Sequence, residues 1–277
     1  VWMCFSLSAQ KIIDLSGKWS FSIDRQDNGE KEKWFSHTLN DFINLPGSMP
    51  EKLKGDEVTA KTQWTGSLYD SSYYYNPYME KYRKEGNIKF PFFLTPDKHY
   101  VGAAWYQKEV NIPADWKGER ILLFLERPHI ETTVWVNGQK TGMQNSLCVP
   151  HQYDITRYVR PGKCTITIRV DNRIKEINVG PDSHSITDQT QGNWNGIVGR
   201  ICLQTTPKTY FDDIQIYPEP EQKLARVKVV IKGAGITKIK LSAESFNTDK
   251  KHIVPAIQQE IKLNKGVTET EMVLPMG

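Results

Sequence analysis

The residues best suited to binding chemistry lie in one polar string, residues 187–195, which runs directly into an apolar strand pattern. The string holds one aspartate, two glutamines and two asparagines around a single tryptophan. Carboxylate and amide side chains bind hydroxyl groups in fixed directions, and an indole face can stack on the C–H face of a sugar ring. We interpret the string as a candidate carbohydrate contact; the alternative is a polar loop whose tryptophan is anchored in the core. The candidate substrate-binding residues are Asp188, Gln189, Asn193 and Trp194.

Several polar residues in and near this string also have plain structural interpretations. A tryptophan that enters a strand, as Trp194 does, more often belongs to the core than to a binding site. Asn193 and Asn195 are as well suited to capping a turn as to binding a ligand. His184 is expected at the surface, and residues 171–173 are expected to hold their loop through hydrogen bonds and salt bridges.

The elements that must position the string have the pattern of β-strands almost throughout. Residues 19–24 and 165–170 alternate apolar and polar side chains, which is typical of a half-buried strand. Residues 121–125 form a continuous apolar run, as in a strand buried on both faces. Val134-Trp135-Val136 leads into Asn137-Gly138, the dipeptide most typical of a tight hairpin. With no competing amphipathic helical stretch, the pattern predicts an all-β sandwich or barrel.

A second set of strands follows a boundary near residues 205–207. Residues 214–217, 227–231, 239–243 and 271–274 each carry a strand pattern. The segment from 208 to 277 is shorter than the roughly 100 residues of an immunoglobulin-type sandwich. We therefore expect a second, incomplete β-sandwich domain, and an excerpt of a longer protein.

An unusual insert lies between the first strand region and Trp105, at about residues 54–100. It mixes aromatic residues with glycine, serine and proline, and loops this long are usually functional. It could form one wall of a carbohydrate cleft, or it could be held by its own aromatics against a neighbouring domain. The aromatic residues are Trp64, Tyr69, Tyr73, Tyr74, Tyr75, Tyr78, Tyr82, Phe90, Phe92 and Phe93.

The composition is that of an ordinary globular protein, with 38% hydrophobic and 25% charged residues. The formal net charge is only +4, and lysine and arginine are spread along the chain, so no nucleic-acid partner is indicated. No stretch after the first residues is long and apolar enough to span a membrane, so no membrane partner is expected.

The first nine residues resemble the end of a signal peptide, because an apolar run closes in small residues. We therefore expect a secreted or periplasmic protein. Beyond this segment the chain has three cysteines, Cys148, Cys164 and Cys202, without the spacing of a zinc site. We expect them to be buried free thiols, with a Cys148–Cys164 disulfide as the less favoured alternative, and we expect no metal and no cofactor.

Several strings in consistent order resemble glycoside hydrolase family 2. Individually they are weak signals, since many sandwiches carry a similar hairpin, but their order over residues 14–207 is specific. The segment from 208 onward is similar to the immunoglobulin-like domain that follows in the family. The strings are Gly102–Val110 with Ile112-Pro113, Leu125-Glu126-Arg127, Thr133–Gly138, Tyr153–Thr156, Pro161-Gly162, Ile168–Asn172 and Gly192–Leu203.

The resemblance implies a jelly-roll sugar-binding domain, an immunoglobulin-like domain and then a catalytic (β/α)8 barrel in the parent protein. In the family the barrel supplies both glutamates for retaining hydrolysis of a terminal glycoside, so we expect no catalytic residue here and no activity of this chain alone. In the family an aspartate before the closing strand reaches the sugar subsite of the barrel, and Asp188 occupies the matching position. The β-galactosidase branch also uses an asparagine before the first core strand, whereas residues 90–95 contain none.

Three functions remain open from the sequence. The favoured one is the non-catalytic N-terminal region of an exo-acting glycosidase, which buttresses the barrel and contributes to its sugar subsite. The second is a carbohydrate-binding protein that acts alone and uses the aromatic insert as its platform. The third is a structural spacer whose loops contact other domains.

Overall fold

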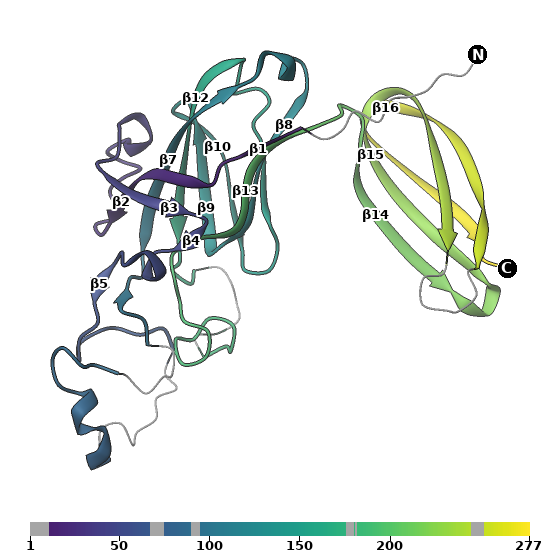
Figure 1. Ribbon diagram of the computed structural model, residues 1–277. Coiled ribbons are helices and arrows are strands. Elements are labelled where there is room, and N and C mark those ends of the chain that lie inside the picture. Colours follow the sequence, from purple (N-terminus) through teal and green to yellow (C-terminus); the bar gives the residue numbers. More distant parts are fainter. Residues whose placement is uncertain (1–10, 67–74, 90–94, 176–179, 181, 245–251) are drawn as a thin grey trace. The chain divides into compact units, whose positions relative to one another are not determined.

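The computed structural model describes residues 11–66, 75–89, 95–175, 180, 182–244 and 252–277, and these are mostly β-strands (Figure 1). They divide into two compact units, which meet in sequence between Thr205 and Thr206. The expected signal-peptide remnant, residues 1–9, lies outside the described residues, as does part of the insert. No helix in the described ranges is long and apolar enough to cross a membrane.

The first unit is a sandwich of two antiparallel sheets, which confirms the all-β prediction. One sheet has the strand order β1-β13-β8-β11, with β4 also paired to β13, and the other has the order β10-β9-β12-β7-β2-β3. The strands are β1 Ile12–Asp14, β2 Gly17–Asp24, β3 Asp41–Leu45, β4 Gly47–Ser48, β7 Ala103–Ile112, β8 Arg120–Pro128, β9 Ile130–Val136, β10 Gln139–Ser146, β11 His151–Asp154, β12 Gly162–Asp171 and β13 Gly196–Thr206. Short 3-10 helices lie in the connections, namely η1 Trp34–Ser36, η2 Pro50–Lys52, η3 Pro77–Tyr82 and η4 Ala114–Trp116.

The core between the two sheets follows from the period-2 alternation of the strands. On β12, Ile166, Ile168 and Val170 are completely buried in this core. On β8, residues 121–125 are buried at every position, as their continuous apolar run predicts. The Asn137-Gly138 turn joins β9 to β10, and both residues have the positive φ that a two-residue hairpin requires.

The outer face of the six-stranded sheet is covered as well, which explains why β9 is buried along its whole length. The connection that contains η1 lays Trp34 and Phe35 over Trp105 and Trp135. The indole nitrogen of Trp105 donates a hydrogen bond of 2.9 Å to Asp24 at the end of β2. Polar residues on this face are therefore buried and must find partners within the protein.

The insert is closed at its base by a short ladder. β5 Asp56–Glu57 pairs antiparallel with β6 Lys98–His99. Within the insert, Trp64 is buried against Val58 and Tyr82. Tyr69, Tyr73, Tyr74, Phe90, Phe92 and Phe93 lie outside the described residues.

The three cysteines do not share one environment. Cys164 and Cys202 are buried free thiols, and burial raises the pKa of Cys164 to about 11. Cys148 is exposed in the connection between β10 and β11, so the expectation that it is buried was wrong. A connection at the sheet edge offers no apolar layer to cover a small side chain.

The second unit is a three-stranded antiparallel sheet in the order β14-β15-β16. Its strands are β14 Tyr210–Glu219, β15 Leu224–Glu244 and β16 Ile253–Pro275, with η5 Pro220–Gln222 in the first connection. Buried side chains from both sides of the glycine bulge in β15 form one small core. Directly paired residues of an antiparallel ladder share a face of the sheet.

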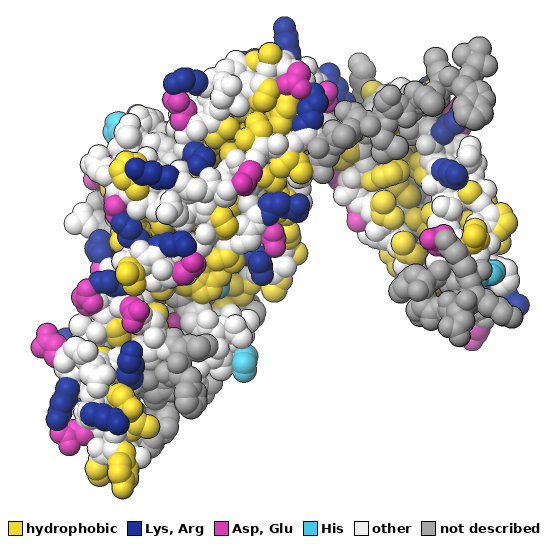
Figure 2. Space-filling view, in the orientation of Figure 1, with side chains coloured by type: hydrophobic (Ala, Val, Ile, Leu, Met, Phe, Trp, Pro, Cys, Tyr) yellow, Lys and Arg dark blue, Asp and Glu magenta, His cyan; other side chains and the backbone are white. Residues whose placement is uncertain are grey.

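The core-side face of β14 is uncovered in this unit. Ile214 pairs with Val229, and Ile216 pairs with Val227. The valines are 3% and 4% exposed, whereas Ile214 is 49% and Ile216 is 65% exposed. Figure 2 shows hydrophobic side chains gathered over β14.

Replacing Gly196 with alanine is expected to destabilise the first unit by about 2 kcal/mol or more. Gly196 has a φ of +144°, and an added Cβ would lie 2.5 Å from the carbonyl oxygen of Gly47 in the paired strand β4. Gly192→Ala is the matched control, because Gly192 also has a positive φ but open space around it. Urea unfolding followed by tryptophan fluorescence measures the free energy of unfolding of both variants. An equal loss of stability in the two would show that the contact with β4 does not matter.

Candidate functional site

The polar string forms a loop, which we call the lip (residues 187–195), directly before β13. Asp188 lies at its centre and is only 3% exposed. Its Oδ1 accepts a hydrogen bond of 2.7 Å from the backbone N–H of Asn193, and its Oδ2 accepts one of 2.5 Å from the backbone N–H of Thr65. The backbone N–H of Asp188 donates in turn to the carbonyl of Thr65. Asp188 therefore ties the lip to the insert.

The two asparagines of the lip anchor it to the sandwich. The amide of Asn195 is completely buried: it accepts from the Tyr106 hydroxyl and donates to the carbonyls of Gly102 and Val170. The amide of Asn193 donates to Thr65 Oγ1 and to the carbonyl of Asn172, each at 3.0 Å. The Asn195 side chain therefore joins the lip to distant parts of the sandwich and does not cap a local turn.

Trp194 is half-buried and stacks on His129, with ring centroids 4.4 Å apart. His129 lies between β8 and β9 and is itself buried. Burial lowers the pKa of His129 to about 4, against the opposing influence of Asn193 and of the Asp188 charge. The imidazole under the indole is therefore neutral at physiological pH.

A second histidine joins the lip from the insert. His99 Nε2 lies 3.4 Å from Asp188 Oδ2, and both side chains are more than nine-tenths buried. The ring of His99 also packs against Trp64, with centroids 4.7 Å apart. Asp188 is therefore surrounded by two backbone N–H donors and one imidazole.

The structure places the four candidate residues in one loop but in different environments. Asp188 and Asn193 are buried, Trp194 is half-buried and Gln189 is exposed. His184 is exposed, as expected. Thr65, His99 and His129 were missed by sequence reasoning, since each lies far from the lip in sequence and no local pattern marks it.

A cluster of charged residues lies at the C-terminal end of β12. Asp171 is fully buried and accepts hydrogen bonds from Arg169 and Arg173, while Lys175 lies 2.7 Å from its Oδ2. Burial alone would raise the pKa of Asp171, but the hydrogen bonds from Arg173 and Lys175 outweigh it and hold the pKa well below its ordinary range. The expected loop-holding role of residues 171–173 is confirmed.

The lip carries a single carboxyl group among its side chains. Asp188 is its only acid, whereas glycoside hydrolysis by the retaining or inverting route needs a pair of carboxyl groups. Both Asp188 oxygens accept a backbone hydrogen bond, and the side chain is only 2% exposed. Among the described residues, no group of three His, Cys, Asp or Glu side chains is placed to hold a metal ion.

The sequence model of the family described as "Glycosyl hydrolases family 2, sugar binding domain" matches residues 12–207. The chain belongs to this family. The matched segment covers the whole sandwich together with the insert and the lip, which confirms the resemblance seen in the sequence.

Named relatives carry this domain within longer proteins. The chain is 24% identical to human β-glucuronidase over 258 residues, which is 82% of this chain and 34% of the relative. It is 27% identical to the β-glucuronidase of Paenibacillus borealis over 222 residues, 75% of this chain and 31% of the relative. It is 24% identical to the β-galactosidase of Thermoanaerobacter pseudethanolicus over 197 residues, 66% of this chain and 26% of the relative. The chain thus spans about a third of the length of such relatives.

Solved structures show the same fold. The β-glucuronidase of Ruminococcus gnavus in complex with D-glucaro-d-lactam matches with a TM-score of 0.60 at 17% identity, over 97% of this chain and 40% of that protein. The β-glucuronidase of an uncultured Clostridium sp. matches with a TM-score of 0.56 at 21% identity, over the whole chain and 41% of that protein. At these identities the likeness extends to the fold alone.

Proposed function

We propose that this chain is the non-catalytic N-terminal region of a secreted or periplasmic exo-acting glycoside hydrolase of family 2. A catalytic (β/α)8 barrel in the same parent protein would then supply the two carboxyl groups that hydrolysis requires. The chain covers only about a third of its relatives' length, and the core-side face of β14 is uncovered, both of which support a longer parent. The apolar residues 1–9 support export.

We further propose that the lip forms part of the terminal-sugar subsite that the barrel completes. The observation that carries this proposal is Asp188, a carboxylate held in one orientation by the N–H groups of Thr65 and Asn193. A fixed acceptor of this kind selects hydroxyl positions and orients the sugar before the reaction. Trp194 and Gln189 add a half-buried ring and an exposed amide to the same loop.

The substrate class follows from the relatives. This chain resembles β-glucuronidases and a β-galactosidase, so we propose a terminal β-glycoside as substrate. Assaying the full-length parent against a panel of aryl β-glycosides tests this proposal. We expect hydrolysis of one terminal sugar by the parent and none by residues 1–277 alone. A parent that hydrolyses no aryl glycoside would overturn the enzymatic role.

A stand-alone carbohydrate-binding protein is the second candidate, because Tyr75 and Tyr78 in the insert are 82% and 85% exposed. Exposed aromatic rings are the usual platform for sugar stacking. This candidate predicts micromolar glycan affinity for the chain alone, and loss of that affinity in the Tyr75→Ala and Tyr78→Ala variants. A subsite shared with a barrel should bind only weakly without it.

A further inference from the structure

Two adjoining hollows lie beside the base of the insert and share Arg25. The larger encloses about 440 Å³, which falls within the roughly 300–1,000 Å³ of small-molecule sites. The smaller, of about 200 Å³, is also lined by Arg25. We call the two together the Arg25 groove. None of the four candidate residues of the lip lines it.

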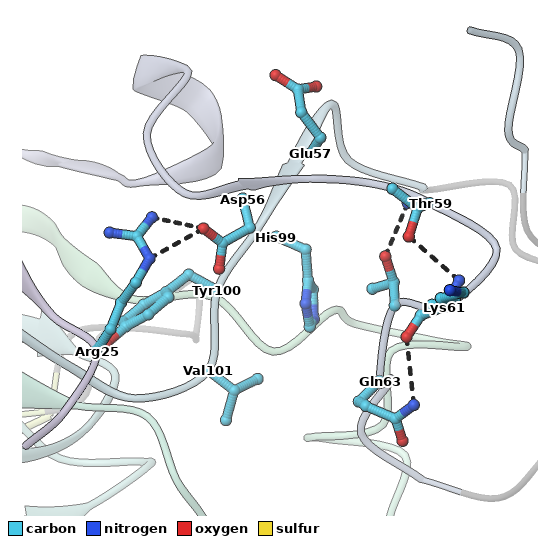
Figure 3. Close-up of a pocket in the computed structure, with 10 residues that line it drawn as sticks. Arg25, Asp56, Glu57, Thr59, Lys61, Gln63, His99, Tyr100 and Val101 are labelled. Carbon is cyan, nitrogen blue, oxygen red and sulfur yellow. Dashed lines mark hydrogen bonds and ion pairs between the residues drawn. The ribbon is translucent and has the colours of Figure 1, made fainter. Parts of the chain in front are cut away.

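The larger hollow has two polar walls, as Figure 3 shows. Arg25 and Asp56 stand on one side, residues 59–63 stand on the other, and His99 lies between them. The walls come from the end of β2, from β5 and from the start of the insert.

Arg25 and Asp56 form a donor–acceptor pair at the wall. Both hydrogen bonds from the Arg25 guanidinium go to Oδ1 of Asp56. Within the described part of the chain, Oδ2 of Asp56 accepts none. A guanidinium beside a free carboxylate oxygen can bind two neighbouring hydroxyls: the guanidinium donates to one, and the carboxylate oxygen accepts from the other.

His99 forms the inner end of the larger hollow. It is 7% exposed, and its Nε2 is buried without a hydrogen-bond partner among the described residues. Its Nε2 lies 3.4 Å from Asp188 Oδ2.

The smaller hollow supplies an aromatic face and amides. Trp34 lines it and is half-buried, and its indole nitrogen is held by Glu32 at 2.9 Å. Gln26 and Asn28 line the same hollow. An indole held in one orientation can stack on a sugar ring, and neighbouring amides can hydrogen-bond its hydroxyls.

The charges of the larger hollow balance, because Arg25 and Lys61 are offset by Asp56 and Glu57. An anionic ligand gains nothing from such a lining, whereas a neutral ligand with many hydroxyls meets a donor or an acceptor at each wall. We propose that the Arg25 groove binds a neutral oligosaccharide, with one sugar on Trp34 and the next ones between Arg25 and residues 59–63. The site adjoins the lip through His99, which contacts Asp188, but none of the four candidate residues of the lip lines it.

Titrating residues 1–277 with neutral gluco-, xylo-, manno- and galacto-oligosaccharides by calorimetry or NMR tests the groove. We expect at least one series to bind with a dissociation constant of about 0.1–1 mM, because the groove is open and mostly polar. Arg25→Ala and Gln63→Ala should each weaken binding at least tenfold. The Arg25–Asp56 pair is more than half exposed, so its loss should hardly affect stability.

Lys163→Ala is the matched control, since Lys163 forms a similarly exposed ion pair with Glu109 outside the groove. It should leave the affinity unchanged. Absence of binding to every neutral series, or binding that neither groove variant weakens, would overturn the proposal. These results come from the chain alone, so they are separate from the hydrolysis assay that tests the parent's activity.

Discussion

Replacing Asp171 with asparagine is expected to lower the free energy of unfolding of the first unit by about 3 kcal/mol. Asp171 is completely buried and is surrounded by Arg169, Arg173 and Lys175. Removing its charge leaves the buried Arg169 guanidinium with weaker compensation, and an asparagine amide brings N–H donors against the donors of both arginines. Most of the cost is the desolvation of charges that have lost their partner.

Asp27→Asn is the matched control, because Asp27 pairs with the same two arginines while its side chain is 42% exposed. Its cost should stay below about 1 kcal/mol, since solvent screens an exposed pair. Urea unfolding measured by tryptophan fluorescence reports mainly on the first unit, because seven of the eight tryptophans lie within residues 19–194. Equal costs for the two variants would show that burial of the network is unimportant.

The same network makes stability sensitive to acid. The folded-state pKa of Asp171 is lowered, so its stabilising contribution is complete above the ordinary carboxyl pKa of about 4 and is lost as pH falls below it. The difference between the wild-type chain and Asp171→Asn should therefore shrink progressively below pH about 4.

Acidification from pH 7 to pH 4 is expected to cost a further 3 kcal/mol or so through His129 alone. Burial lowers the pKa of His129 from 6.5 to about 4 in the folded protein. Between these values the unfolded chain binds a proton that the folded chain does not, so stability falls as pH decreases through this window. Protonating His129 in the folded protein would place a charged imidazole in the buried space beneath Trp194, and this is unfavourable.

His129→Phe isolates this effect, because phenylalanine keeps a ring beneath Trp194 and cannot titrate. His129 Nε2 has no hydrogen-bond partner within the described residues, although the substitution also removes the side-chain interaction of His129 with Asn193. The unfolding free energies of both proteins should be measured at several pH values. The wild type should lose about 3 kcal/mol more than the variant; parallel curves would contradict a neutral buried His129.

The strand pattern alone predicted most of the fold. Alternation over residues 165–170 placed Ile166, Ile168 and Val170 in the core, and Asn137-Gly138 placed a hairpin turn. The pattern could not show that Trp34 and Phe35 cover the outer face of the six-stranded sheet. That cover depends on a long irregular connection, whose path is set by packing rather than by periodicity.

The sequence predicted which residues form the candidate site, but it did not predict how deeply each side chain is buried. The pattern marked Asp188 and Trp194, but whether a loop residue is buried depends on contacts from elsewhere in the chain. Asp188 is held by Thr65, which lies 123 positions earlier, and Trp194 rests on His129. Such contacts arise from the close approach of the insert to the lip, and a single sequence carries no local signal of it.

The central claim is that the lip, organised by Asp188, forms part of the terminal-sugar subsite. Its most direct test is kcat/KM of Asp188→Asn in the full-length parent, measured on the aryl glycoside that the parent hydrolyses best. Asparagine keeps the size of the side chain but replaces an acceptor oxygen with a donor, so we expect a fall of about 100-fold. Asp154→Asn, which removes a turn-binding aspartate elsewhere in the first unit, is the control and should leave kcat/KM unchanged. A kcat/KM within about twofold of wild type for Asp188→Asn, or roughly 0.4 kcal/mol, would contradict the claim.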